Sequence, residues 1–232
     1  MIILSSDFSH VYVRDAAFMH ILCLKSAFFG SALEEDMWIQ TENDRICGVI
    51  ARFGGRLYIW QDGTDPEEIS VFMNTVGFCE IFTSYETALQ LGLTIQDSFD
   101  TLVKKADGKN IETCEISLKA LYDALIAGDD GGIDLPSFEI FAPDFSHRLR
   151  HNAAAATAES YGAAIAFCCN NGGIINGIAV DKSKRGQGLG SMLLNKLLKN
   201  LCGDVFVCSG KENTEFYVKN GFELIGKAVI AR

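Results

Sequence analysis

The sequence predicts an α/β (α+β) protein of two domains, each with a mixed, mostly antiparallel central sheet flanked by helices. Three observations lead to this prediction. The 232 residues suffice for two domains of about 115 residues each, which is a common domain size. The second half alternates between segments with strand-like and helix-like patterns of apolar residues. The first half shows a fainter version of the same order, which suggests an internal repeat.

Three consecutive strand-like runs occupy the middle of the second half, at residues 154–160, 163–169 and 174–180. Turn-forming residues separate these runs, so we expect an antiparallel meander. Helices are predicted from the spacing of apolar residues, or from a start signal such as Ser117 or Pro143, at residues 117–126, 142–150, 189–201 and 213–220. Short strands at 205–208 and 222–230 complete the order.

The first half carries weaker signals of the same kinds. Residues 41–52 and 56–60 flank a Phe-Gly-Gly turn and predict a hairpin, which is followed by a helix at 65–75 that opens with Pro and acidic residues. A strand at 80–83 and a helix at 84–91 follow. The polar stretch 104–110 reads as a loop, so we place the join between the domains there, with one domain at 1–110 and the other at 111–232.

Charge and cysteine content exclude several classes of function. The formal net charge is −10, and the excess of acidic residues lies entirely within the first 115 residues, so neither nucleic acid nor an anionic membrane is expected as a partner. The eight Cys form no CxxC pair and lie mostly in apolar runs, which predicts reduced thiols and no metal site. The N-terminus lacks a signal-peptide pattern, and no apolar run approaches membrane-spanning length, so we expect a cytoplasmic protein.

The segment from Val180 to Ser191 carries the clearest chemical signal. Glycines at 186, 188 and 190 leave the main chain uncrowded just before a predicted helix, whose first N–H groups and positive dipole end attract anions. Lys182, Lys184 and Arg185 add positive charge. The segment lacks the Lys of a Walker A loop and the GxGxxG spacing of a dinucleotide fold, so it predicts a different kind of pyrophosphate site.

Two motifs in the second half resemble those of the GNAT superfamily of acyl-CoA-dependent N-acetyltransferases. The segment Arg185-Gly186-Gln187-Gly188-Leu189-Gly190 matches the family's Arg/Gln-x-x-Gly-x-Gly/Ala pattern. Residues 213–222 match a second pattern, Asn…(Leu/Phe)-Tyr-x-x-x-Gly-Phe. The resemblance covers roughly residues 116–232, so domain 111–232 is expected to be a GNAT acetyltransferase domain, and domain 1–110 a degenerate, acidic GNAT-like copy without the glycine loop.

The resemblance implies acetyl-CoA as co-substrate, a small-molecule or peptide amine as acceptor, and the following roles. The pyrophosphate would bind main-chain N–H groups of the loop, and the pantetheine arm would pair with the strand before it. Tyr217 would protonate the departing thiolate, and Asn213 would contact the CoA arm or cap its helix. The residues implied in cofactor binding are Ile178, Ala179, Val180, Arg185, Gly186, Gln187, Gly188, Leu189, Gly190, Ser191 and Asn213.

The general base has no clear candidate, because the strand at 174–180 lacks the carboxylate that many relatives place there. Glu159, at the end of the first meander strand, is the nearest carboxylate, although it also reads as a solvated turn residue. His147, His151 or water are the alternatives. The predicted reaction is direct attack of a primary amine on the thioester. A non-catalytic acyl-CoA-binding or sensing module is the alternative function, and a homodimer is left open.

Overall fold

A computed structural model describes residues 1–5, 7–8, 10–28, 36–63, 65–108, 117–129, 133 and 135–232. The chain divides into two compact units. One contains residues 1–102, 208–218 and 223–232, and the other contains residues 103–207 and 219–222. The expected join at residue 110 lies outside the described residues. The division into a degenerate domain at 1–110 and a catalytic domain at 111–232 stays a prediction, and the compact units do not follow it in chain order.

The first unit is built on a sheet with both antiparallel and parallel pairs. Strands β1 to β4 pair antiparallel in chain order, β4 and β5 pair parallel, and β5 pairs antiparallel with β11. Its elements are β1 (Ile2–Leu4), α1 (Ala16–Phe28), β2 (Met37–Glu42), β3 (Arg45–Phe53), β4 (Arg56–Gln61), α2 (Pro66–Val76), β5 (Glu80–Ser84), α3 (Tyr85–Gln90), the first part of β6 (Ile95–Asp107), most of α7 (Lys211–Lys219) and β11 (Glu223–Ala231).

The second unit has the same plan. Strands β7, β8 and β9 form an antiparallel meander, and β9 pairs in parallel with β10. Its elements are the end of β6, α4 (Leu118–Gly128), α5 (Phe138–Arg150), β7 (Ala154–Glu159), β8 (Gly162–Cys169), β9 (Gly172–Val180), the 3₁₀ turn η1 (Lys182–Lys184), α6 (Leu189–Leu198) and β10 (Cys202–Ser209).

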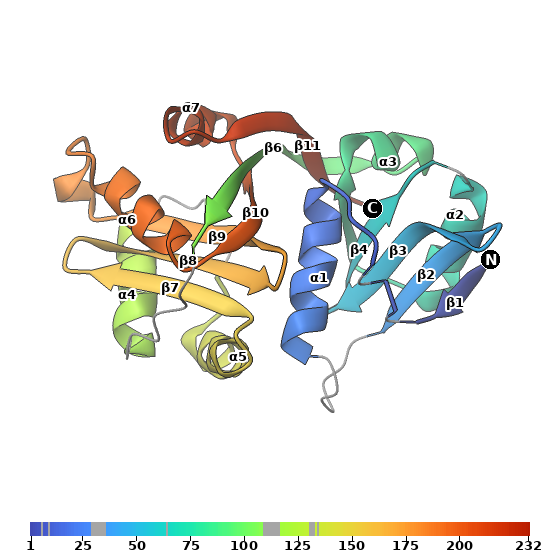
Figure 1. Ribbon diagram of the computed structural model, residues 1–232, viewed down its shortest axis with the longest axis horizontal. Helices are drawn as coiled ribbons and strands as arrows, with labels where there is room; N and C mark the ends of the chain where they lie inside the picture. Colours follow the sequence, from blue (N-terminus) through green and yellow to red (C-terminus); the bar gives the residue numbers. More distant parts are fainter. Residues whose placement is uncertain are drawn as a thin grey trace. The chain divides into compact units, whose positions relative to one another are not determined.

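Helices cover both faces of the meander in the second unit (Figure 1). On one face, α4 and α5 bury Leu121, Leu125, Phe141 and Phe145 against β7 to β9. On the other face, α6 buries an apolar stripe at helical spacing, which includes Leu193 and Leu197. The predicted α/β class, with a mostly antiparallel sheet flanked by helices, is therefore confirmed.

Both halves of the chain repeat one order of elements, namely a meander, a helix, a parallel strand and a second helix. Strand β11 of the second half belongs to the first unit, and β6 of the first half is divided between the two units. Strand β11, at the C-terminus, completes the first unit by pairing with β5, with Ala228 opposite Ser84 and Ala231 opposite Ile81. Residues 103–107 of β6 belong to the second unit, where β6 is the neighbour of β10.

Three local predictions need correction. Residues 41–52 are not one strand, because Asn43 and Asp44 have positive φ (48° and 61°) and form the tight turn between β2 and β3. Residues 104–107 are strand rather than loop, because β6 runs to Asp107. Helix α5 starts at Phe138, so Pro143 lies inside it rather than at its start. Core packing of Phe141 and Phe145, on either side of the Pro, outweighs the preference of Pro for a helix start.

Candidate functional site

The glycine loop between β9 and α6 holds a left-handed backbone at two positions. Gly186 and Gly188 have φ of 77° and 78°. A Cβ added at either position would meet no atom within 4 Å. Packing inside the protein therefore does not explain these glycines. They provide the left-handed turns and leave the main chain open to approach from outside.

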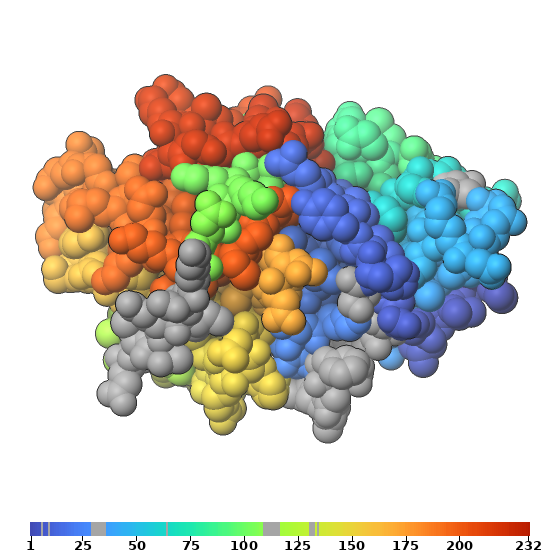
Figure 2. All heavy atoms as spheres, viewed as in Figure 1, coloured from blue at the N-terminus to red at the C-terminus, as the bar shows by residue number. Residues whose placement is uncertain are grey.

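Helix α6 starts with unpaired main-chain donors. Gly188 is its N-cap and supplies no side-chain hydrogen bond. The bond from Met192 N to Gly188 O (3.2 Å) opens the helix, so the N–H groups of residues 189–191 precede the regular helical bonding. Such donors, together with the positive end of the helix dipole, favour an anion at this position. The loop and α6 lie at the surface of the second unit (orange in Figure 2).

Two basic side chains of the loop are bound to main-chain carbonyls. Lys184 Nζ donates to Ser160 O at 3.1 Å. The Arg185 guanidinium donates to Gly128 O at 2.6 Å and to Val180 O at 3.2 Å. These side chains keep positive charge near the loop while they also fix its position. The contact with Gly128 was not foreseen from sequence, since no spacing pattern links residues 57 positions apart.

Strand β9 changes its pairing before it reaches the loop. A register shift between β8 and β9 leaves Asn176 as an extra residue, since Ile165 pairs with Gly177 and Ala166 with Ile175. Among the described residues, β10 pairs with β9 only from Gly172 to Ile175. Residues 178–180 keep their partners on β8. The edge of 178–180 that faces away from β8 therefore lies beyond the paired part of β10.

Tyr217 and Asn213 lie in α7, in a segment that groups with the first unit. Tyr217 is 8% exposed, and burial raises its pKa to about 12, so the phenol stays protonated at neutral pH. Asn213 is exposed, and its amide group donates to Glu212 Oε1 at 3.3 Å. The glycine loop and residues 178–180 thus belong to the second compact unit, whereas Asn213 and Tyr217 belong to the first.

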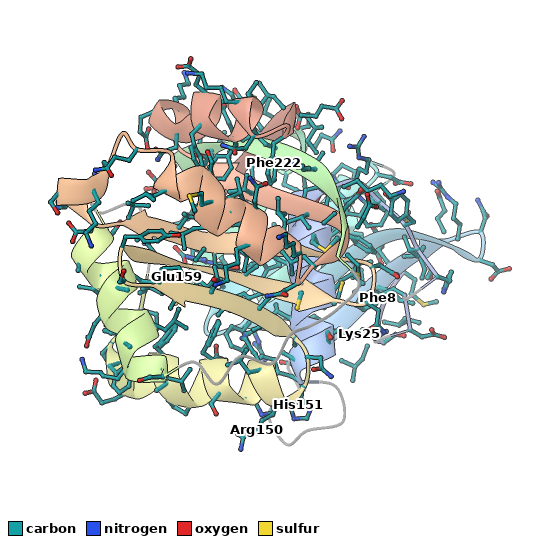
Figure 3. All side chains as sticks on the ribbon, turned by 60° about the vertical axis from the view of Figure 1, so that its left-hand side comes forward. Phe8, Lys25, Arg150, His151, Glu159 and Phe222 are labelled. Atoms are coloured by element: carbon teal, nitrogen blue, oxygen red, sulfur yellow. The ribbon has the colours of Figure 1, made fainter. Side chains whose placement is uncertain are left out.

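Glu159 gains no support as the general base. The register places it opposite Gly162 on β8, which in turn is opposite Val180 on β9. Two strand spacings separate the main chains of Glu159 and Val180 by roughly 10 Å, and the role of Glu159 as a base stays a prediction. The carboxylate forms an ion pair with Lys196 of α6. Figure 3 shows Glu159 at the end of β7, below α6.

A broad hollow of about 1090 Å³ lies beside α6 in the second unit. Residues from β6, β7 and α6 line it, including Glu159 and Lys196, whereas none of the described lining residues belongs to the glycine loop. The volume of this hollow therefore says nothing about the anion site. We base the site on the loop and the start of α6.

The described residues give little support to a cysteine nucleophile or a metal site. Burial raises the pKa of the Cys168 thiol to about 12, so it does not form a nucleophilic thiolate at neutral pH. In the described part of the chain, no three His, Cys, Asp or Glu side chains are arranged to hold a metal ion. No helix among those residues is long and apolar enough to cross a membrane.

Residues 151–224 match the family model described as the acetyltransferase (GNAT) domain. The chain contains a GNAT domain. The match spans β7 to the start of β11 and includes both the glycine loop and α7. It confirms the resemblance found in the motifs and the expectation of an acyltransferase. A search of curated proteins finds no significant match.

Solved GNAT structures share the fold over most of the chain. A GCN5-related N-acetyltransferase from Sphaerobacter thermophilus is 12% identical with a TM-score of 0.57, covering 93% of this chain and 90% of its own. One from Kribbella flavida is 14% identical with a TM-score of 0.55, covering 79% and 85%. A tandem GNAT protein from the clavulanic acid biosynthesis pathway is 11% identical with a TM-score of 0.53, covering 100% and 97%.

Proposed function

We propose that this protein transfers the acetyl group of acetyl-CoA to a primary amine. The observation that carries the proposal is the start of α6, where two left-handed glycines and the absence of a side-chain cap leave donors for a pyrophosphate. Residues 186–191 would bind the pyrophosphate through main-chain N–H groups. The edge of residues 178–180 would pair with the pantetheine arm, and one of its amides would polarise the thioester carbonyl.

The chemistry we propose is direct attack by the amine, without an acyl-enzyme. Two of the thiols support this choice, because burial raises the pKa of both Cys168 and Cys208 to about 12 and leaves little of their thiolate at neutral pH. Tyr217 would protonate the departing thiolate of CoA. A phenol with a pKa of about 12 donates its proton only transiently and returns to the neutral form. We assign no side chain as the general base.

The role of Tyr217 is tested by Tyr217→Phe, which removes the hydroxyl and keeps the buried ring. We expect kcat to fall by roughly 100-fold, as for loss of a general acid, with the KM for acetyl-CoA little changed. Val218→Ala, an exposed neighbour on the same helix, is the control. Full activity of Tyr217→Phe on every accepted amine would remove Tyr217 from the mechanism.

The proposed activity is tested on a panel of primary amines by measuring the acetylated product by mass spectrometry. Detection of released CoA with a thiol reagent is unsuitable, because Cys79 and Cys202 are exposed and would react with the reagent. Acetyl-CoA affinity is measured separately by calorimetry. Product formation that depends on acetyl-CoA supports the enzyme, and absence of acetyl-CoA binding would reject it.

A non-catalytic acyl-CoA-binding module is the second candidate function. The observation in its favour is that β9, Gly172–Val180, contains no carboxylate, while Glu159 is held by Lys196. Micromolar binding of acetyl-CoA, with no acetylated product from any amine in the panel, would favour this candidate over the enzyme.

A further inference from the structure

Arg185 joins three elements of the second unit at one point. Its guanidinium donates from Nη2 to Gly128 O, at the end of α4, and from Nε to Val180 O, at the end of β9. Arg185 itself belongs to the loop that leads into α6. One side chain therefore connects the last residue of a helix, the last residue of a strand and the start of the glycine loop.

The end of α4 offers the guanidinium a favourable partner. Gly128 is the last residue of α4, where carbonyl groups lack helical donors and the helix dipole is negative. A hydrogen bond from a charged donor to such a carbonyl is stronger than a neutral one. The planar guanidinium can donate hydrogen bonds to two carbonyl oxygens at once, and a Lys ammonium does this less well.

Close packing brings α4 near enough for this contact. A Cβ at Gly128 would lie 2.9 Å from the Ala179 Cβ and 3.0 Å from Val180 N, so only glycine lets the helix end rest on β9. The glycine is thus explained by the approach of helix and strand. The contact also places the guanidinium charge on the α4 side of the loop.

We propose that Arg185 is a positioning residue that ties the glycine loop to the end of α4. The tie holds the start of α6 in its ligand-ready arrangement before any ligand binds, which lowers the ordering cost of binding. Its importance for catalysis rests on the proposed function, although the tie itself exists in the free protein. The alternative, in which Arg185 acts as a direct phosphate contact, makes different predictions for the free protein.

Hydrogen exchange of the ligand-free protein separates the two roles. The reporters on the loop side are the bonded amides of Asp181, Lys184 and Met192, and the reporter on the α4 side is Asp129, whose N–H donates to Ile126 O. We expect Arg185→Gln to speed exchange at both sides by about tenfold, the effect of losing hydrogen bonds to a charged group. A direct phosphate contact would leave exchange in the free protein unchanged.

Lys182→Gln is the matched control, because it removes one positive charge from the same loop and leaves both Arg185 and Gly128 in place. We expect it to leave exchange at Asp129 unchanged. Arg185→Lys keeps the charge and loses the two-point geometry, so it should still exchange several-fold faster than the native protein. Native exchange rates in both Arg185→Gln and Arg185→Lys would overturn the proposal.

Kinetics provide the second readout. Arg185→Gln should raise the KM for acetyl-CoA about tenfold with kcat nearly unchanged, since the loop must be ordered again at each binding event. Gly128→Ala pushes the end of α4 away from both β9 and Arg185, so it should impair binding at least as much as Arg185→Gln does, and the double variant should be no worse than Gly128→Ala alone. Additive effects would contradict the tie. If acetyl-CoA does not bind at all, the proposed function fails, whereas the exchange result still decides the role of Arg185.

Discussion

Helices α2 and α6 occupy the same place in the repeated order of elements and start in opposite ways. Each follows an antiparallel meander and precedes a strand that pairs in parallel with the meander's last strand. Helix α2 opens with Asp65, whose carboxylate accepts from Glu68 N, and it continues with two Glu in its first turn. Helix α6 opens with Gly188 and has no acidic residue in its first turn. One start is occupied by its own carboxylates, and the other is open.

The strands beside the two helices differ in the same sense. In the first unit, paired residues of β4 and β5 end at Tyr58 and Phe82. Beyond them, Thr83 Oγ1 donates to Ile59 O at 2.7 Å, and Gln61 Nε2 donates to Gln90 Oε1 at 2.8 Å. Both Thr83 and Gln61 are buried, so side chains close this end of the first sheet. A few residues therefore distinguish the open start of α6 from the occupied start of α2.

The net charges of the two units differ in the same direction as their helix starts. The first unit has 18 acidic and 8 basic residues, a net charge of −10, and the second has 12 of each. A net charge of zero does not repel an anionic ligand, and lysines and Arg185 are close to the open helix start. The local and the overall electrostatics thus agree on which unit would bind CoA.

The largest expected effect comes from giving α6 the kind of start that α2 has. Gly188→Asp places a carboxylate at the N-cap, in a left-handed conformation that Asp tolerates. We expect acetyl-CoA affinity, measured by calorimetry, to fall by roughly 100-fold, because a carboxylate would stand where the pyrophosphate is proposed to bind. Gly188→Asn, which has the same shape without the charge, should lose much less. Equal losses in the two variants would mean that backbone strain is responsible rather than charge.

Asp15, at the start of α1, shows that a buried acidic N-cap can lower the stability of the protein at neutral pH. Asp15 caps α1 by accepting from Phe18 N at 2.9 Å. Burial raises the pKa of the Asp15 carboxyl group to about 6, although hydrogen bonds from the main chain of Phe18 and Ala17 lower it. The negative charge of Glu86 adds to the rise. Arg14, Thr101 and Lys227 line the same small cavity. Because the folded pKa lies above the usual value of 3.8, its contribution to stability is full below about pH 4 and is lost as the pH rises through 6.

Asp15→Asn keeps a cap and removes this titration. We expect its free energy of unfolding to exceed that of the native protein by about 1–3 kcal/mol at pH 7.5, and the gain to shrink at pH 4.5. Urea unfolding at the two pH values checks this. Glu86→Gln should give a smaller change in the same direction. A gain that is independent of pH would show that the carboxyl charge is not the cause.

The smallest effect tests whether the start of α2 is purely structural. Asp65→Ala removes the N-cap and should lower the free energy of unfolding by about 1 kcal/mol. The KM for acetyl-CoA should not change. Asp65→Ser, which can still cap, should restore most of the stability. A change in KM without a change in stability would mean that the first unit takes part in cofactor binding.

Much of this fold was predictable because its signals are local. Three glycines before a helical apolar stripe identify the loop and α6, and Ser84 with Gly92 marks both ends of α3. Helix α1 carries no such signal, because its apolar residues surround it and most of it is buried. The turn at Asn43 and Asp44 was missed because neither residue is glycine, although Asn and Asp tolerate positive φ.

Long-range contacts account for the rest. The pairing of β5 with β11 joins residues 144 to 150 positions apart, and hydrophobic periodicity gives no information about such partners. The bond between Arg185 and Gly128 likewise depends on tertiary packing. For the site, the sequence motifs predict roles for the loop and Tyr217 that stay predictions, whereas the ion pair of Glu159 with Lys196 became visible only in the structure.

The position of β11 in the first sheet has a consequence for synthesis on the ribosome. Residues of the first sheet up to Ser84 are made early, yet the strand that pairs with β5 begins at Glu223. At about 5–20 residues per second, the nascent chain waits roughly 7–30 s with that edge of β5 uncovered. An exposed strand edge can pair with another chain and so promote aggregation or domain swapping. The first sheet is therefore complete only after residues 228–231 have been synthesised and have paired with β5.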